Sequence, residues 1–244
     1  MRFFPIAAAI CLAQPALAAD WYTGARPTQP ADDWVVSVSA SADVTSQGSS
    51  FADVQVTGAP AGSLDQSGVR LRVEGLGGRY SYYSTADART IDGTQLSGAF
   101  LAGYQWLSPS LAVSAYLGAD IRDNTLSVVD PGNPVVGTSV GGAAQFELFA
   151  MPTRRTMVDV AASYETNATA YFVRLRGGYL VAPGIYVGPE VLALGDAFFA
   201  QQRLGAHLTG LRLGPTRLSL AAGYLYDRVR KAGAYSTISA SVDF

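Results

Sequence analysis

The stretch AYSTISASVDF, residues 234–244, decides the fold that we predict for this chain. Its even-numbered residues run from Ala234 to Phe244 and are mostly small or apolar, whereas its odd-numbered residues run from Tyr235 to Asp243 and carry polar groups. Successive side chains of a β-strand point to opposite faces, so such a strand has one apolar face and one polar face. A strand that separates lipid from a watery lumen needs this pattern. We therefore predict that the stretch is the closing strand of an outer-membrane β-barrel.

The start of the chain predicts export from the cytoplasm. Residues 1–18 combine a positive start, a short apolar run and a small-residue cleavage site that ends at Ala18, as a secretory signal peptide does. The apolar run is too short to be a membrane-spanning helix. Cleavage would remove Cys11, the one cysteine of the sequence, and leave a mature protein without disulfides. We expect residues 19–33 to form a periplasmic lead-in and residues 34–244 to form the barrel.

The composition narrows the class of protein. Hydrophobic residues make up 49% of the chain and charged residues only 15%, and the net charge is -2. A chain with so little positive charge has no basic field for nucleic acid, so we predict no nucleic-acid partner. No shift in composition and no low-complexity linker divides the sequence, which favours a single domain.

The alternation of the closing strand recurs along the chain and predicts an all-β, antiparallel transmembrane barrel of about twelve strands. An even number of strands returns the C-terminus to the periplasm and places the short turns on that side. A closed barrel also leaves no strand edge with unpaired backbone groups in lipid. The predicted strands are residues 34–45, 50–58, 68–82, 96–106, 111–122, 137–150, 156–165, 170–181, 185–194, 200–211, 217–228 and 234–244.

Two segments depart from regular alternation. Gly75, Gly77 and Gly78 interrupt the third strand, and we expect a bulge or a bend there, since glycine inside a strand often marks one. Residues 123–136 contain two prolines, which exclude a continuing strand. This segment is therefore predicted to be the longest outer loop.

The polar faces of the predicted strands collect the candidate functional residues in the lumen. Arginines and carboxylates are nearly balanced there, and we expect most of them to pair across strands and to fill or stiffen the lumen. Alternatively, they line a conduit and sort permeants, while lumenal tyrosines offer stacking faces to sugar rings. The width of a twelve-strand barrel allows both readings. The predicted lumenal network and saccharide contacts are Arg70, Arg72, Glu74, Tyr116, Asp120, Arg122, Glu147, Asp159, Glu165, Arg174, Arg176, Tyr186, Glu190, Arg203 and His207.

Catalysis has weak support in the sequence. His207 is the only histidine and would share a lumenal face with Glu190 and Arg203. A hydrolase needs a nucleophile beside its base and a third group that orients the base, and no such motif is legible. One histidine with scattered carboxylates also lacks the spacing of a metal site. We therefore predict no enzymatic activity, no metal and no cofactor.

Six segments of the sequence are AGYQW (102–106), DPGNP (130–134), YFVRLRGGY (171–179), GPE (188–190), QQRLGAHLTGLR (201–212) and AAGY (221–224). In combination these segments resemble the BcsS family of cellulose biosynthesis proteins. The resemblance implies a role in making or exporting cellulose, with cellulose or a cello-oligosaccharide, the synthase and export apparatus, and outer-membrane lipid of a Gram-negative bacterium as partners. A main polymer pore would need periplasmic helical repeats or a wide barrel, so an accessory role is favoured over a conduit. A general small-solute channel and a lipid-modifying barrel enzyme are the alternatives.

Overall fold

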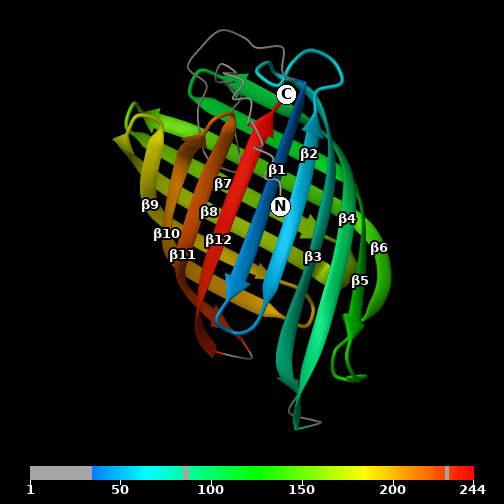
Figure 1. Ribbon diagram of the computed structural model, residues 1–244. Helices are drawn as coiled ribbons and strands as arrows, with labels where there is room; N and C mark the ends of the chain where they lie inside the picture. The colour runs from blue at the N-terminus through cyan, green and yellow to red at the C-terminus, as the bar shows by residue number, and fades with distance from the viewer. Residues whose placement is uncertain (1–34, 85–87, 229–230) are drawn as a thin grey trace, which may run out of the picture.

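The computed structural model describes residues 35–84, 88–228 and 231–244, and these form a closed antiparallel barrel of twelve strands (Figure 1). The all-β class, the closure and the number of strands are as predicted. The predicted signal peptide, the lead-in and Trp34 lie outside the described residues. The strands are β1 (Val36–Thr45), β2 (Ser50–Gly58), β3 (Gly68–Ser84), β4 (Arg89–Ser108), β5 (Leu111–Leu126), β6 (Gly137–Thr153), β7 (Thr156–Glu165), β8 (Ala170–Ala182), β9 (Ile185–Gly195), β10 (Ala200–Leu213), β11 (Thr216–Asp227) and β12 (Lys231–Asp243).

Within the described residues, the only helix is a single 3-10 turn at Asn167–Thr169. None of the helical structure there is long and apolar enough to cross a membrane.

The first and last strands close the barrel, as the alternation of residues 234–244 predicts. β1 pairs with β12 along its length, with Ala40 opposite Ala240. Phe244 continues this seam, because its N–H donates to Val36 O at 2.8 Å and its carbonyl accepts from Val35 N at 2.8 Å. Every strand therefore has a neighbour on both sides, which satisfies the backbone without water.

The two ends of the barrel differ in their connections. We call the end where β1 begins and β12 finishes the terminal end, and the opposite end the loop end. Two-residue turns join strands at the terminal end, together with the longer segment 59–67. Residues 127–136 form the longest described connection at the loop end. β3 and β4 project there as a long hairpin, seen at the bottom of Figure 1.

Side chains sort between the outside and the lumen by their parity along each strand. Leu96, Leu117 and Leu204 point outward with exposed fractions of 68%, 71% and 62%. Arg72 and Arg176 point inward and are buried. The outer surface is therefore apolar and the charges are internal, which is the distribution that a lipid-embedded barrel requires.

The predicted bulge at Gly75, Gly77 and Gly78 is wrong. β3 pairs with β2 and β4 through all three glycines without a shift of register. Gly78 instead lies opposite Phe51, whose ring occupies the place of the missing side chain, with Cδ1 2.1 Å from where a β-carbon would be. The glycine makes room for a ring and does not bend the strand. A register shift occurs elsewhere, beside Gly210 with its positive φ of 86°.

Some predicted boundaries also move. The loop predicted at 123–136 is shorter, because β5 stays paired with β4 as far as Leu126 and only residues 127–136 leave the sheet. β4 begins seven residues before Leu96, at Arg89, where the β3–β4 hairpin extends the sheet. Both differences lengthen strands at the loop end. The strands continue there beyond the apolar and polar alternation from which the sequence prediction is made.

An arginine placed on the outer surface tests whether that surface faces lipid. We expect Leu117→Arg, near the middle of β5, to lower the free energy of unfolding by about 2–4 kcal/mol, because a charge at the bilayer midplane is costly. Leu213→Arg is the matched control at the end of β10 and should cost about 0–1 kcal/mol. Urea unfolding in lipid vesicles, followed by gel mobility, measures both. Equal losses would contradict a lipid-facing outer surface.

Candidate functional site

A bidentate ion pair crosses the lumen between β3 and β6. Arg72 donates from Nη1 and Nη2 to Glu147 Oε1 and Oε2 at 2.7 and 3.0 Å. The Arg72 guanidinium lies 3.9 Å from the centre of the Tyr116 ring, and its Nη1 also donates to Gln145 Oε1 at 2.8 Å. Gln145 in turn donates to Glu74 at 2.7 Å. Since β4 and β5 separate the paired strands, the arginine reaches across the inside of the barrel.

A second group ties β8 and β9 to β11 and β12. Arg176 Nε donates to Glu190 Oε2, and both side chains are about 2% exposed or less. Tyr235 donates from its hydroxyl to the other Glu190 oxygen at 2.8 Å. Arg176 also donates to Ser219 Oγ at 3.4 Å. Both charges are therefore paired and hydrogen-bonded, as burial of a charge demands.

Three further ion pairs lie on the lumenal faces of the described strands. Arg203 binds Asp43 through two bonds of 2.6 and 3.0 Å, which link β10 to β1. Arg174 lies 3.2 Å from Asp159, one strand away. The third pair, between Arg217 and Asp243 at 2.5 Å, includes an arginine that sequence reasoning missed. The alternation along β11 could have identified this arginine, because position 217 falls on the inward face of the strand.

Arg70 is not part of the predicted charge pairing. Its Nε donates to Gln105 Oε1 at 3.0 Å, and Nη2 donates to Ser63 O at 3.2 Å and to the carbonyl of Gln66. These carbonyls belong to segment 59–67 at the terminal end. The arginine therefore anchors a connection to the barrel wall, which alternation within strands could not reveal.

The predicted tyrosines and histidine lie in the packed, terminal half of the lumen. Tyr116 packs with Leu101, and Tyr186 packs with Phe149 and Met157, all of them nearly inaccessible. His207 is 2% exposed, and its Nε2 lies 3.1 Å from the carbonyl oxygen of Gly177. No hydroxyl nucleophile is bonded to this ring in the described residues. Side chains therefore occupy the terminal half.

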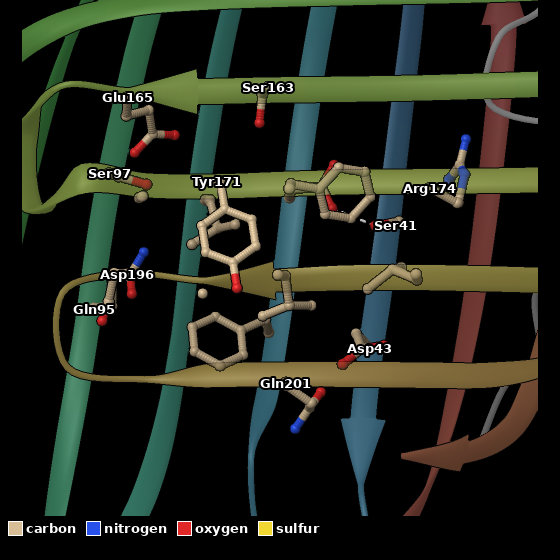
Figure 2. A pocket seen from close by; sticks show the side chains of 18 of the residues that line it. Ser41, Asp43, Gln95, Ser97, Ser163, Glu165, Tyr171, Arg174, Asp196 and Gln201 are labelled. Carbon is tan, nitrogen blue, oxygen red and sulfur yellow. Dashed lines mark hydrogen bonds between the residues drawn. The ribbon is translucent and has the colours of Figure 1, made fainter. Parts of the chain in front are cut away.

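The loop half of the lumen, in contrast, contains a cavity of about 450 Å³. Strands from opposite walls contribute to it, with β7 to β10 crossing β1 to β4 (Figure 2). Arg122 lies there, 2.6 Å from Glu165 and 3.6 Å from Asp196. Asp120 accepts a bond from Asn167 Nδ2 nearby. The polar side chains labelled in Figure 2 that line it include Ser41, Asp43, Gln95, Ser97, Ser163, Glu165, Arg174, Asp196 and Gln201.

The cavity is acidic. Among its described lining residues, ten are aspartates or glutamates and four are arginines. The arginines are Arg122, Arg174, Arg176 and Arg203. The carboxylates are Asp43, Asp53, Glu74, Asp120, Glu147, Asp159, Glu165, Glu190, Asp196 and Asp227.

Aromatic rings that the sequence prediction did not assign to a site line one wall of this cavity. Phe51 and Tyr80 lie with ring centres 6.5 Å apart and planes at 11°. Tyr82 continues the row and meets Phe198 edge-on at 4.9 Å. A bulge is expected from the sequence before Tyr80 and Tyr82, so the sequence could not predict whether these two side chains point inward or outward. With unbroken alternation from Glu74, both point inward.

All fifteen predicted residues thus lie on lumenal faces. Some are packed in the terminal half and some line the cavity, whereas Glu147, Arg176 and Glu190 lie at the boundary between the two. The structure does not bring them together as one site. No three described His, Cys, Asp or Glu side chains gather as a metal site would require. Absence of a metal and of a cofactor stays a prediction.

The chain is similar to known proteins in sequence and in fold. The model of a protein family described as "Cellulose biosynthesis protein BcsS" matches residues 30–244. No curated protein sequence matches the chain. A monoaromatic hydrocarbon channel, a TodX deletion mutant, shares the fold at a TM-score of 0.52 and 9% identity, covering 87% of this chain and 90% of that one. A KdgM porin gives 0.46 and 9%, covering 85% and 99%. Omp33 of Acinetobacter baumannii gives 0.42 and 12%, covering 86% and 98%.

Removal of one arginine tests whether paired side chains close the lumen at the inner boundary of the cavity. We expect Arg176→Ala to cost about 3–5 kcal/mol of folding free energy, because Glu190 is left buried without its partner. It should also raise single-channel conductance in planar bilayers above a near-silent wild type. Arg154→Ala, in an exposed turn, should change neither quantity. A folded Arg176→Ala barrel with unchanged conductance would place the barrier elsewhere.

Proposed function

Since the chain belongs to the BcsS family of cellulose biosynthesis proteins, we propose that it serves cellulose secretion at the outer membrane as an accessory barrel. In this proposal it is not the pore that conducts the polymer. Cellulose and the synthase and export apparatus are its proposed partners.

The filled terminal half of the lumen is the observation that carries the accessory role. Arg72 pairs with Glu147 across the lumen from β3 to β6, and Arg176 pairs with Glu190 between the adjacent strands β8 and β9, at the boundary with the cavity. All four side chains are buried. A polymer chain would have to displace these pairs, and each displacement leaves an unpaired charge in the lumen. A stable ion-pair layer therefore favours a protein that works beside an export channel.

A location in the outer membrane is part of the proposal. It is supported by the closed barrel and by the apolar outer surface around Leu117 and Leu204. With the usual arrangement of such barrels, short turns lie on the periplasmic side. We therefore assign the terminal end to the periplasm and the cavity to the outer side.

We also propose that the barrel is not an enzyme. His207 is the one imidazole of the chain, and its Nε2 is close to a backbone carbonyl. General-base catalysis needs the base within reach of a nucleophile and of substrate. The packed surroundings of His207 offer neither.

Deletion of the gene in its native host tests the proposed function. We expect secreted cellulose, measured by dye binding and by glucose released with cellulase, to fall and to return on complementation with the wild-type gene. Complementation with the Arg154→Ala variant is the matched control and should restore it equally. Normal secreted cellulose in the deletion strain would overturn the role. Cellulose trapped in the periplasm of that strain would contradict an accessory role and favour a conduit.

A further inference from the structure

The cavity at the loop end has a flat aromatic wall that rests on glycines. Phe51 on β2 is paired with Gly78, and Tyr80 on β3 is paired with Gly93. A β-carbon on Gly78 would lie 2.1 Å from Phe51 Cδ1, and one on Gly93 would lie 2.4 Å from Tyr80 Cζ. Both glycines have lumenal parity, so each ring covers the position where an inward side chain would start. The rings therefore lie flat against the wall and turn their other faces to the cavity.

The two rings form one platform. Their planes differ by 11° at a centroid distance of 6.5 Å, and both residues line the cavity. Tyr82 lies at the end of this row of rings. Two hydrogen bonds hold it in place, because its hydroxyl donates to Asp130 Oδ2 at 2.8 Å and accepts from Asn133 Nδ2 at 3.2 Å. A flat, rigid and partly accessible apolar surface of this kind suits a ligand with a flat apolar face.

Hydrogen-bonding groups surround the platform. Gln95 and Ser97 lie on β4, and Gln201 lies on the crossing wall (Figure 2). Asp120 lines the same cavity with little exposure, and its Oδ1 has no hydrogen-bond donor among the described residues. An unpaired buried acceptor is costly unless a ligand or water donates to it. Ligand hydroxyl groups are the donors that such a lining can bind.

The charge of the lining selects between classes of ligand. Ten carboxylates against four arginines give an acidic cavity, which disfavours phosphates and acidic sugars. Flat rings together with carboxylate and amide acceptors match a neutral sugar, whose ring face is apolar and whose edge carries hydroxyls. We propose that the loop-end cavity binds a segment of a neutral oligosaccharide, with sugar rings on Phe51 and Tyr80. The choice of a β-glucan as that ligand rests on the proposed function.

Binding of cellohexaose to the purified full-length barrel in lipid nanodiscs tests this inference. We expect saturable binding by calorimetry, and a loss of affinity of roughly tenfold in the Phe51→Leu/Tyr80→Leu variant, which keeps apolar volume but removes both flat rings. Phe100→Leu, the same change on the outer surface, is the matched control and should bind like wild type. Equal affinity of the folded double variant would overturn the proposal.

Two measurements on the wild-type barrel keep the test valid if the double variant does not fold. Hydroxyl-radical labelling of Phe51 and Tyr80 should fall when cellohexaose is added, while labelling of the outward Phe100 stays constant. Oligogalacturonate of equal length should bind at least roughly tenfold more weakly, since its carboxylates meet an acidic lining. Unprotected rings, or equal binding of the two oligosaccharides, would overturn the proposal.

These outcomes separate the ligand from the role in secretion. A barrel that binds no cellohexaose, in a host whose deletion strain still loses cellulose, overturns the binding site and leaves the accessory role. A barrel that binds cellohexaose through Phe51 and Tyr80, in a host whose deletion strain secretes normally, supports the site and overturns the role.

Discussion

Pairing of β1 with β12 is the constraint on which the rest of the structure depends. Once Val36 and Phe244 complete the seam, no strand edge remains and every side chain faces either the outside or the lumen. The position of a charged residue along its strand, odd or even, then determines whether its side chain faces the lumen. An arginine on the inner face cannot reach bulk solvent sideways, so it must find a partner within the barrel. The ion pairs of the lumen follow from closure.

Much of this arrangement could be predicted from the sequence, because a period of two is a local property. Alternation alone placed Arg72, Glu147, Arg176 and Glu190 on the lumenal face. It could not pair Arg72 with Glu147, since contacts between β3 and β6 depend on the stagger and width of the closed barrel. Glycine was the main source of error, because it serves either a bend or the close approach of a ring, and sequence does not distinguish the two.

The lumen is divided along its axis into parts with different chemistry. The terminal half is filled by side chains that bind one another, and Arg70 also secures the segment 59–67 there. The loop half contains a cavity with rings along one wall. A barrel that is filled at one end and hollow at the other is better suited to holding a ligand than to conducting one. This division is why we propose an accessory role for this member of the family.

The filling of the terminal half and the proposed choice of ligand both depend on where the arginines lie in the lumen. Arg70, Arg72 and Arg217 are committed to the terminal half, where they hold carbonyls or carboxylates. They do not line the cavity, although Arg72 binds the lining residue Glu147, and the carboxylates of the lining outnumber its arginines. The acidity that would exclude anionic sugars is thus a consequence of where the arginines are needed to fill the barrel. A variant that frees a terminal arginine would loosen the closed half without neutralising the cavity, so the two properties can be separated by mutation although they arise together.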